Sequence, residues 1–220
     1  MTMKRVLFTC FVLLVFVGTA HATLYSGSLT TGTNTLLAFG AWSGDTISVA
    51  WDVDDTTNPG YWSYNYTLTG FAGPSISHGI FEVSSNFTSD NIKEGTSGDR
   101  ELGTFGPSQG GSNPGIPGSI FGIKFNTGDE GTINITIVSD REPMWGDFYG
   151  KGGDASYAYN SGFGFDTFAP IGSGNALSDG KAWALVPDTN PVPEPSTMLL
   201  LGLGVMGIAA AGRRKRSNKV

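Results

Sequence analysis

The sequence predicts an all-β protein, an antiparallel β-sandwich or jelly-roll, and three observations support this fold class. Of the 220 residues, 33 are glycine and 12% are aromatic, whereas only 15% are charged, which is unlike the composition of a helical protein. Apolar and polar residues alternate with period two in several segments, and turn residues separate these segments. No sustained helical period occurs between the two ends of the chain, so short strands packed as two sheets are expected.

The chain begins with the pattern of a signal peptide, predicted to occupy residues 1–22. Two basic residues precede a largely apolar run at 6–17, and Ala20 and Ala22 fit the small-residue cleavage site of signal peptidase. This apolar run is too short to cross a hydrocarbon core of ~30 Å. We therefore expect export through the Sec machinery and cleavage after Ala22.

Residues 23–187 are predicted to form one glycine-rich, acidic ectodomain. The only cysteine, Cys10, lies in the signal peptide, so this domain must be held by its core without disulfides. Six basic residues and all nineteen acidic residues lie between 23 and 194. The net negative charge of this domain excludes nucleic acid as a partner and is compatible with cations or neutral sugars as ligands.

The clearest alternation occurs at 62–69 and at 132–138, which read as strands with one buried face. Residues 126–131 contain two glycines, so they are expected to form the turn of a hairpin that ends in 132–138. Residues 103–118 are expected to form a long loop, and 87–92 a single helical turn. The other predicted strands are 46–53, 75–84, 120–125, 163–168 and 182–186.

The chain ends with a proline-rich linker, an apolar run and a basic cluster, in that order. Residues 188–220 contain all three, and 196–212 is predicted to be a transmembrane helix. Seventeen helical residues reach about 25 Å, so long cationic side chains must extend to the interface. Four consecutive cations begin the cytoplasmic tail at 213–220: Arg213, Arg214, Lys215 and Arg216. The linker ends in four residues that read as a sorting element: Val192, Pro193, Glu194 and Pro195.

This three-part tail resembles the PEP-CTERM sorting signal of Gram-negative, often biofilm-forming bacteria, and the likeness covers 192–220. The resemblance implies recognition by an exosortase, a membrane cysteine transpeptidase, and cleavage near the Pro-Glu-Pro residues. The implied outcome is release, or transfer to the cell surface or to extracellular polysaccharide. The same tail is also known as an ice-binding protein C-terminal domain, but the threonines at 31–35 and 67–69 form no regular array, so we do not expect ice binding.

We expect no enzymatic activity from the ectodomain. After signal cleavage His78 is the only histidine and no cysteine remains, which excludes the usual zinc sets and Cys-His sites. The residues at 106–110 match the Gly-x-Ser-x-Gly pattern of a nucleophile elbow. Residues 111–115 cannot form the helix that such an elbow requires, so the match is attributed to the high glycine content. His78 is expected to be a strand residue that hydrogen-bonds within the sheet.

The densest acidic cluster consists of Asp52, Asp54 and Asp55, and it suggests a weak calcium site. Carboxylates at alternate positions, followed by turn oxygens, suit a calcium ion. The alternative, which the sequence favours, is a solvated turn at the end of a strand. No other cofactor is expected.

The most distinctive internal segment is 140–150, which resembles a stretch found in the outer domains of other PEP-CTERM proteins. Trp145 and Tyr149 are four residues apart and would form a platform for stacking a sugar if they were exposed. The alternative is that both rings pack at an edge of the sandwich.

Together these features predict an exported cell-surface or matrix protein, sorted by an exosortase, with a structural or adhesive role near extracellular polysaccharide. A carbohydrate-binding module is the first alternative, and exposed aromatic rings in a groove would favour it. A secreted glycoside hydrolase is the second, and two carboxylates roughly 5–9.5 Å apart in a cleft would favour that reading. The expected partners are signal peptidase, the exosortase, polysaccharide and, through the C-terminal helix, the membrane.

Overall fold

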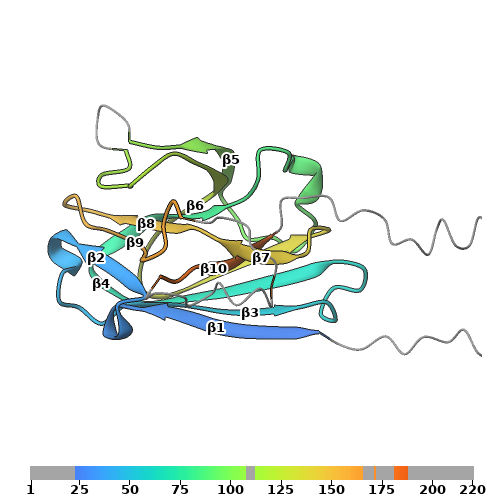
Figure 1. Cartoon of the computed structure of the whole chain (residues 1–220), viewed down its shortest axis with the longest axis horizontal. Coiled ribbons are helices and arrows are strands. Elements are labelled where there is room, and N and C mark those ends of the chain that lie inside the picture. The colour runs from blue at the N-terminus through green and yellow to red at the C-terminus, as the bar shows by residue number, and fades with distance from the viewer. Residues whose placement is uncertain (1–22, 108–111, 166–170, 172–180, 188–220) are drawn as a thin grey trace, which may run out of the picture.

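The computed structural model describes residues 23–107, 112–165, 171 and 181–187, and within them the protein is all-β (Figure 1). Three single-turn 3-10 helices are present: η1 (Thr31–Thr33), η2 (Gly40–Trp42) and η3 (Ser89–Asn91). The helix η3 confirms the helical turn predicted at 87–92. The ten strands are β1 (Leu24–Thr30), β2 (Leu36–Phe39), β3 (Ser48–Asp54), β4 (Trp62–Glu82), β5 (Arg100–Phe105), β6 (Ile120–Ser139), β7 (Pro143–Gly146), β8 (Phe148–Gly152), β9 (Tyr157–Asn160) and β10 (Ala184–Pro187).

Several predicted features lie outside the described residues. These are the signal peptide at 1–22 with its cleavage site, the helix at 196–212, the cytoplasmic tail at 213–220 and the sorting element at 192–195. Within the part of the chain that the structure does describe, no helix has the length and hydrophobicity needed to cross a membrane.

Two long antiparallel strands, β4 and β6, form the backbone of the fold. They pair from Trp62 opposite Ser139 to Glu82 opposite Gly122. The predicted hairpin at 126–131 is therefore wrong, because β6 passes through these residues as one strand. Gly128 and Gly131 have φ values of 64° and 82°, and the register of the pair shifts in this region. The glycines introduce bulges that bend the strand instead of reversing it.

The other strands extend the sheet from these two. The free side of β4 pairs with β3 along its first half and with β8 along its second half. β1 continues the sheet from β3, whereas β9 and then β2 continue it from β8, and β5 pairs with β6. A separate two-stranded sheet joins β7 and β10. In Figure 1, β1 and β3 lie along the bottom, and β5, β6 and β8 lie above them.

The sandwich is produced by bending this one large sheet upon itself. Tyr66 and Phe81 are both on β4, yet their rings stack with centroids 3.9 Å apart, whereas fifteen residues of straight strand would separate them by about 50 Å. The two halves of the sheet therefore face each other and bury a common core. The small sheet closes this core, since the Tyr66 hydroxyl donates a hydrogen bond of 2.7 Å to the carbonyl oxygen of Leu185 on β10.

Antiparallel sheets packed as a sandwich confirm the predicted fold class, but some predicted strands and loops differ from the structure. Residues 163–165, predicted to begin a strand, form a turn in the structure. The predicted loop at 103–118 is wrong at its start, because β5 extends to Phe105. β3 and β10 match the strands predicted at 46–53 and 182–186 to within two residues.

Candidate functional site

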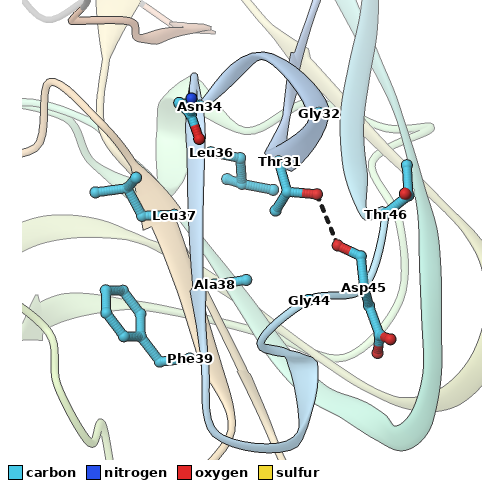
Figure 2. Close-up of a pocket in the computed structure, with 10 residues that line it drawn as sticks. All are labelled: Thr31, Gly32, Asn34, Leu36, Leu37, Ala38, Phe39, Gly44, Asp45 and Thr46. Carbon is cyan, nitrogen blue, oxygen red and sulfur yellow. Dashed lines mark hydrogen bonds between the residues drawn. The ribbon is translucent and has the colours of Figure 1, made fainter.

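An open groove of about 440 Å³ lies beside the edge strand β2 (Figure 2). One wall is β2 itself, and the opposite wall is the segment 44–46, which connects η2 to β3. Residues 31–34 close one end. Among the strands that the structure describes, β2 pairs with β9 alone, and its other edge borders this groove.

Hydrogen bonds from Thr31 and packing of Trp42 hold the groove in shape. The Thr31 hydroxyl donates to the carbonyl oxygen of Asp45 at 2.8 Å and accepts the N–H of Ile47 at 3.1 Å. The indole of Trp42 is fully buried, donates to the carbonyl oxygen of Pro74 at 2.8 Å and packs edge-on against Phe71. Both walls are therefore fixed before any ligand binds.

Strand alternation gives β2 two different faces. Figure 2 shows that Leu36 and Ala38 point toward the wall formed by Thr31 and Asp45, whereas Leu37 and Phe39 point to the opposite side. Leu36 belongs to the main core and Ala38 packs against it. Leu37 and Phe39 therefore lie on the outer face of the sheet, together with the residues that pair with them on β9.

Three aromatic residues, Phe39, Tyr157 and Tyr159, form an aromatic strip on this outer face. Phe39 lies opposite Tyr157 in the register of β2 and β9. The centroid of the Phe39 ring lies 4.8 Å from that of the Tyr157 ring and 5.4 Å from that of the Tyr159 ring. The corresponding interplanar angles are 18° and 19°. All three side chains are half-buried, so they form an outer face of nearly parallel rings.

One border of the aromatic strip is set by the loop that contains Gly115. A Cβ atom at Gly115 would lie only 2.0 Å from Cζ of Tyr157, and Gly115 has a φ of 66°. Other residues rarely adopt this backbone conformation, and only glycine permits the close contact. The Tyr149 hydroxyl donates a hydrogen bond of 2.7 Å to the carbonyl oxygen of Pro114 in the same loop. The loop therefore covers Tyr149 and contacts the strip at Tyr157. Tyr157 and Tyr159 also pack against the hydrophobic cluster beneath the loop, and their half-buried rings form its outer border.

The predicted platform of Trp145 and Tyr149 is not formed. The side chain of Tyr149 is fully buried, and its ring belongs to a second hydrophobic cluster beneath the loop. Trp145 lies on the neighbouring strand β7 and contacts Trp51 edge-on, with ring centroids 6.3 Å apart. The packing alternative therefore describes both residues.

The structure does not bring Asp52, Asp54 and Asp55 together as a metal site. Asp54 accepts hydrogen bonds from the backbone N–H and hydroxyl groups of both Thr56 and Thr57. Asp55 accepts one from the N–H of residue 23 at 2.8 Å, and Asp52 is exposed on β3. Among the described residues, no group of three or more His, Cys, Asp or Glu side chains is arranged to hold a metal ion.

His78 is buried in β4 and its Nε2 hydrogen-bonds to Oδ1 of Asn113 at 3.0 Å. Its Nδ1 lies 3.4 Å from the hydroxyl oxygen of Ser77 on the same strand, so one partner lies within the sheet, as predicted, and the other is a loop residue. Burial lowers the pKa of His78 to about 4, and the Asn113 hydrogen bond only partly opposes this shift. The imidazole is therefore neutral at neutral pH.

Two buried carboxyl groups, Glu82 and Asp147, form the most perturbed acidic pair. Burial, reinforced by the charge of Asp147, raises the pKa of Glu82 to about 8, and burial raises that of Asp147 to about 6. Asp147 is fully buried and accepts hydrogen bonds from the Asn160 amide and the Gly164 N–H. The pair lies in the interior, whereas a glycosidase needs its carboxyl groups beside the sugar.

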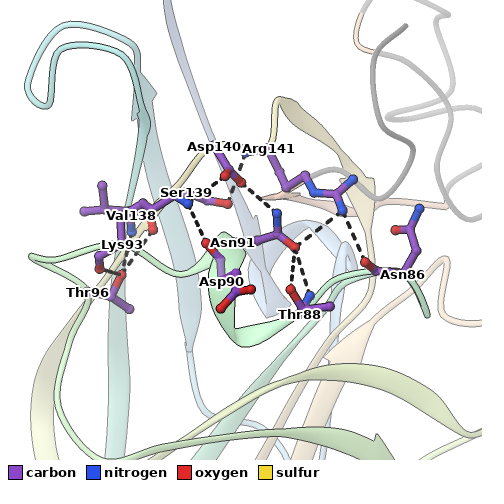
Figure 3. A network of polar contacts seen from close by, with 10 residues as sticks. All are labelled: Asn86, Thr88, Asp90, Asn91, Lys93, Thr96, Val138, Ser139, Asp140 and Arg141. Atoms are coloured by element: carbon purple, nitrogen blue, oxygen red, sulfur yellow. Dashed lines mark hydrogen bonds and ion pairs between the residues drawn. The ribbon is translucent and has the colours of Figure 1, made fainter.

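A polar network attaches η3 to the end of β6 (Figure 3). Lys93 forms an ion pair of 2.7 Å with Asp140, and the Asn91 amide donates to the same carboxylate at 2.9 Å. Arg141 donates to the carbonyl oxygen of Asn86 at 3.2 Å. Asp140 and Arg141, at the start of the distinctive segment 140–150, therefore have structural partners.

The sequence alone does not indicate the aromatic strip. The side chains of β9 alternate between half-buried and buried along Tyr157–Asn160. Four residues are too few to establish a period of two from the sequence. The partner Phe39 lies more than a hundred residues away, so only the folded chain brings the strip together.

Comparison with known protein families finds a match to the PEP-CTERM protein-sorting motif at residues 191–215. PEP-CTERM proteins are exported and sorted to the cell surface, and the motif implies processing by an exosortase. No curated protein matches the chain. One solved structure that it resembles is the KRT10-binding region domain of the pneumococcal serine-rich repeat protein PsrP. That likeness has 12% identity, 77% coverage of this chain, 98% coverage of the other and a TM-score of 0.22, which is too low to support an argument.

Proposed function

Because the chain carries a PEP-CTERM protein-sorting motif, we propose that it is a structural or adhesive protein that associates with extracellular polysaccharide. The observation that carries this proposal is the position of the motif. It begins at residue 191, just after β10 ends at Pro187. A folded β-sandwich is thus joined directly to a signal for surface sorting.

In this proposal the chain follows a defined route. Signal peptidase removes residues 1–22 during Sec export, and the apolar run at 196–212 holds the chain in the membrane with its basic tail in the cytoplasm. The exosortase then cleaves near Val192–Pro195, which transfers the ectodomain to the cell surface or matrix. The membrane is a transient partner.

The ectodomain suits an extracellular location. Its core is built from aromatic and aliphatic side chains of both halves of the sheet, and no cysteine lies after Cys10. Its stability therefore does not depend on the redox conditions outside the cell. Its acidic composition favours solubility and disfavours contact with nucleic acid.

A second candidate function, a carbohydrate-binding module, is favoured by the aromatic strip beside the groove. A binding module describes one surface of the ectodomain, whereas the structural role describes the whole sorted protein. The hydrolase alternative has little support, since Glu82 and Asp147 face the interior.

Fractionation of the producing bacterium tests the proposed function. We expect the ectodomain in the surface and extracellular-matrix fractions of the wild-type strain, and in the membrane fraction of a strain that lacks its exosortase. A deletion strain should also retain less polysaccharide at the cell surface. Accumulation of the wild-type protein in the cytoplasm or periplasm would contradict the proposal.

A further inference from the structure

We propose that the aromatic strip and the groove beside β2 together form a binding site for an uncharged polysaccharide chain. This inference rests on the proposed function, which places the ectodomain among extracellular polysaccharides. It adds the site and the class of ligand. Phe39 connects the two features, because its ring belongs to the strip and its residue also borders the groove.

The strip offers the apolar contact that a sugar ring requires. Pyranose rings present flat C–H faces, and these pack against aromatic rings in the same way as other apolar groups. Tyr157 and Tyr159 are two residues apart on β9, and their ring planes differ by only 9° with centroids 6.3 Å apart. The three stacked rings thus present one continuous apolar surface to a sugar chain.

The groove offers the polar contacts that hydroxyl groups require. The side chains of Asn34, Asp45 and Thr46 are exposed at its rim. Over the described ranges, none of these three side chains hydrogen-bonds to another residue of the protein. Their amide, carboxylate and hydroxyl groups are free for a ligand, and a volume of about 440 Å³ is typical of a small-molecule site.

The charges around the site favour an uncharged ligand. Asp45 lies at the groove, whereas Lys151 lies opposite Tyr157 in the register of β8 and β9. One anion and one cation thus flank the strip on opposite sides. The acidic ectodomain as a whole repels anionic polysaccharides, so an uncharged chain is the ligand that meets no electrostatic penalty.

The position of the site suits a protein tethered by its C-terminal end. In Figure 1, β1 begins and β10 ends toward the right, whereas β2 lies at the left end of the sandwich. The site therefore lies at the opposite end of the sandwich from the point where β10 ends, so a polysaccharide can bind before or after the exosortase acts.

Affinity electrophoresis of the mature protein, isolated from its own host, tests this site. The probes are the neutral and acidic fractions of the host's extracellular polysaccharide, each cast separately into native gels. We expect retardation in the neutral fraction and none in the acidic fraction. Tyr159→Ala should weaken binding about tenfold, as loss of a central aromatic contact does.

Two further variants keep the test independent of folding. Asn34 has a φ of 59°, so Asn34→Gly preserves the turn while it removes the amide, and we expect several-fold weaker binding. Tyr61 is 41% exposed beside a different groove, so Tyr61→Ala is the matched control and should bind like the wild type. Thermal melting confirms that each variant is folded.

Two results with the wild type would overturn the inference: no retardation in either fraction, or retardation in the acidic fraction alone. Two results with the variants would also overturn it. Either Tyr159→Ala and Asn34→Gly both bind with wild-type affinity, or Tyr61→Ala loses as much affinity as they do. Each leaves the surface location measured by fractionation unaffected. Failure of this site is thereby distinguished from failure of the proposed function.

Discussion

The side-chain carboxyl group of Glu82 accepts the backbone N–H of Asp147 at 2.9 Å, and the N–H of Glu82 donates to the carbonyl oxygen of Asp147 at the same distance. This reciprocal contact joins the end of β4 to the junction of β7 and β8. Asn160 continues it, because its amide donates both to Asp147 and to the carbonyl oxygen of Ala182. Four separate segments thus meet at two buried carboxyl groups.

The first prediction concerns the pH dependence of stability. Burial raises the pKa of Glu82 from 4.5 to about 8. Between pH 4.5 and 8 the folded protein therefore holds a proton that the unfolded chain releases. The free energy of unfolding falls as the pH rises through this range. Below pH 6.5 the lowered pKa of His78 acts in the opposite direction. We therefore expect a fall between pH 6.5 and 8, measured by urea unfolding.

Glu82→Gln provides the control for this prediction. The amide oxygen of glutamine still accepts the Asp147 N–H, but the side chain does not ionise, so the fall in stability between pH 6.5 and 8 should disappear. An unchanged slope in Glu82→Gln would show that another group causes the dependence.

The second prediction concerns the close contact between Gly115 and Tyr157. In Gly115→Ala the new Cβ would lie 2.0 Å from Cζ of Tyr157 at a φ of 66°, so both the loop and the ring must move. Gly60→Ala is the matched control, because Gly60 has a φ of 89° with no atom near the added Cβ. We expect the control to lose about 1 kcal/mol of stability and Gly115→Ala to lose clearly more, measured by urea unfolding. Equal losses would contradict the contact.

The third prediction concerns the turn after β3. Because Asp54 accepts hydrogen bonds from Thr56 and Thr57, Asp54→Ala should lower the free energy of unfolding by about 1 kcal/mol. Asp52→Ala, at an exposed position on the same strand, should change it by less than about 0.5 kcal/mol.

Calcium provides a separate check of the same turn. Millimolar calcium should leave the melting temperature of the wild type unchanged relative to chelator. A calcium-dependent rise that Asp54→Ala abolishes would restore the weak calcium site suggested by the sequence.

The fourth prediction concerns sorting. Glu194 is the acidic residue of the Pro-Glu-Pro element within the matched motif at 191–215. Glu194→Ala should leave a larger form in the membrane fraction, because the uncleaved tail supplies retention. Immunoblots of membrane and extracellular fractions measure this, and Glu142→Ala, which removes an exposed acid of the ectodomain, should be processed normally. Identical processing of both variants would exclude the role of Glu194.

The sequence predicted the class of the fold because alternation in single strands is local. The side chains of Tyr64, Tyr66 and Leu68 are buried as the pattern at 62–69 indicates. The path of the chain was not predictable in the same way. Gly128 and Gly131 carry the same local signal whether a strand turns back or bulges, and only the register with β4 decides between the two outcomes.

The aromatic strip could not be predicted from the sequence for a related reason. Trp145 and Tyr149 are close in sequence but belong to different strands and different clusters. Phe39 and Tyr157 are far apart in sequence but directly opposite in register. Spacing along the chain indicates which side chains share a strand face, whereas the neighbours of an edge strand depend on the order of strands in the sheet.

The small sheet of β7 and β10 has a mechanical consequence for a tethered protein. If the protein is tethered through the chain beyond Pro187 and binds a ligand at β2, as proposed, tension would enter the domain through β10, which has four residues paired with β7 and is held to β4 by the hydroxyl of Tyr66. The ladder between β4 and β6 is several times longer. We therefore expect β10 to detach first under shear flow, so that the tether would yield at the base of the domain while the end that carries β2 stays folded.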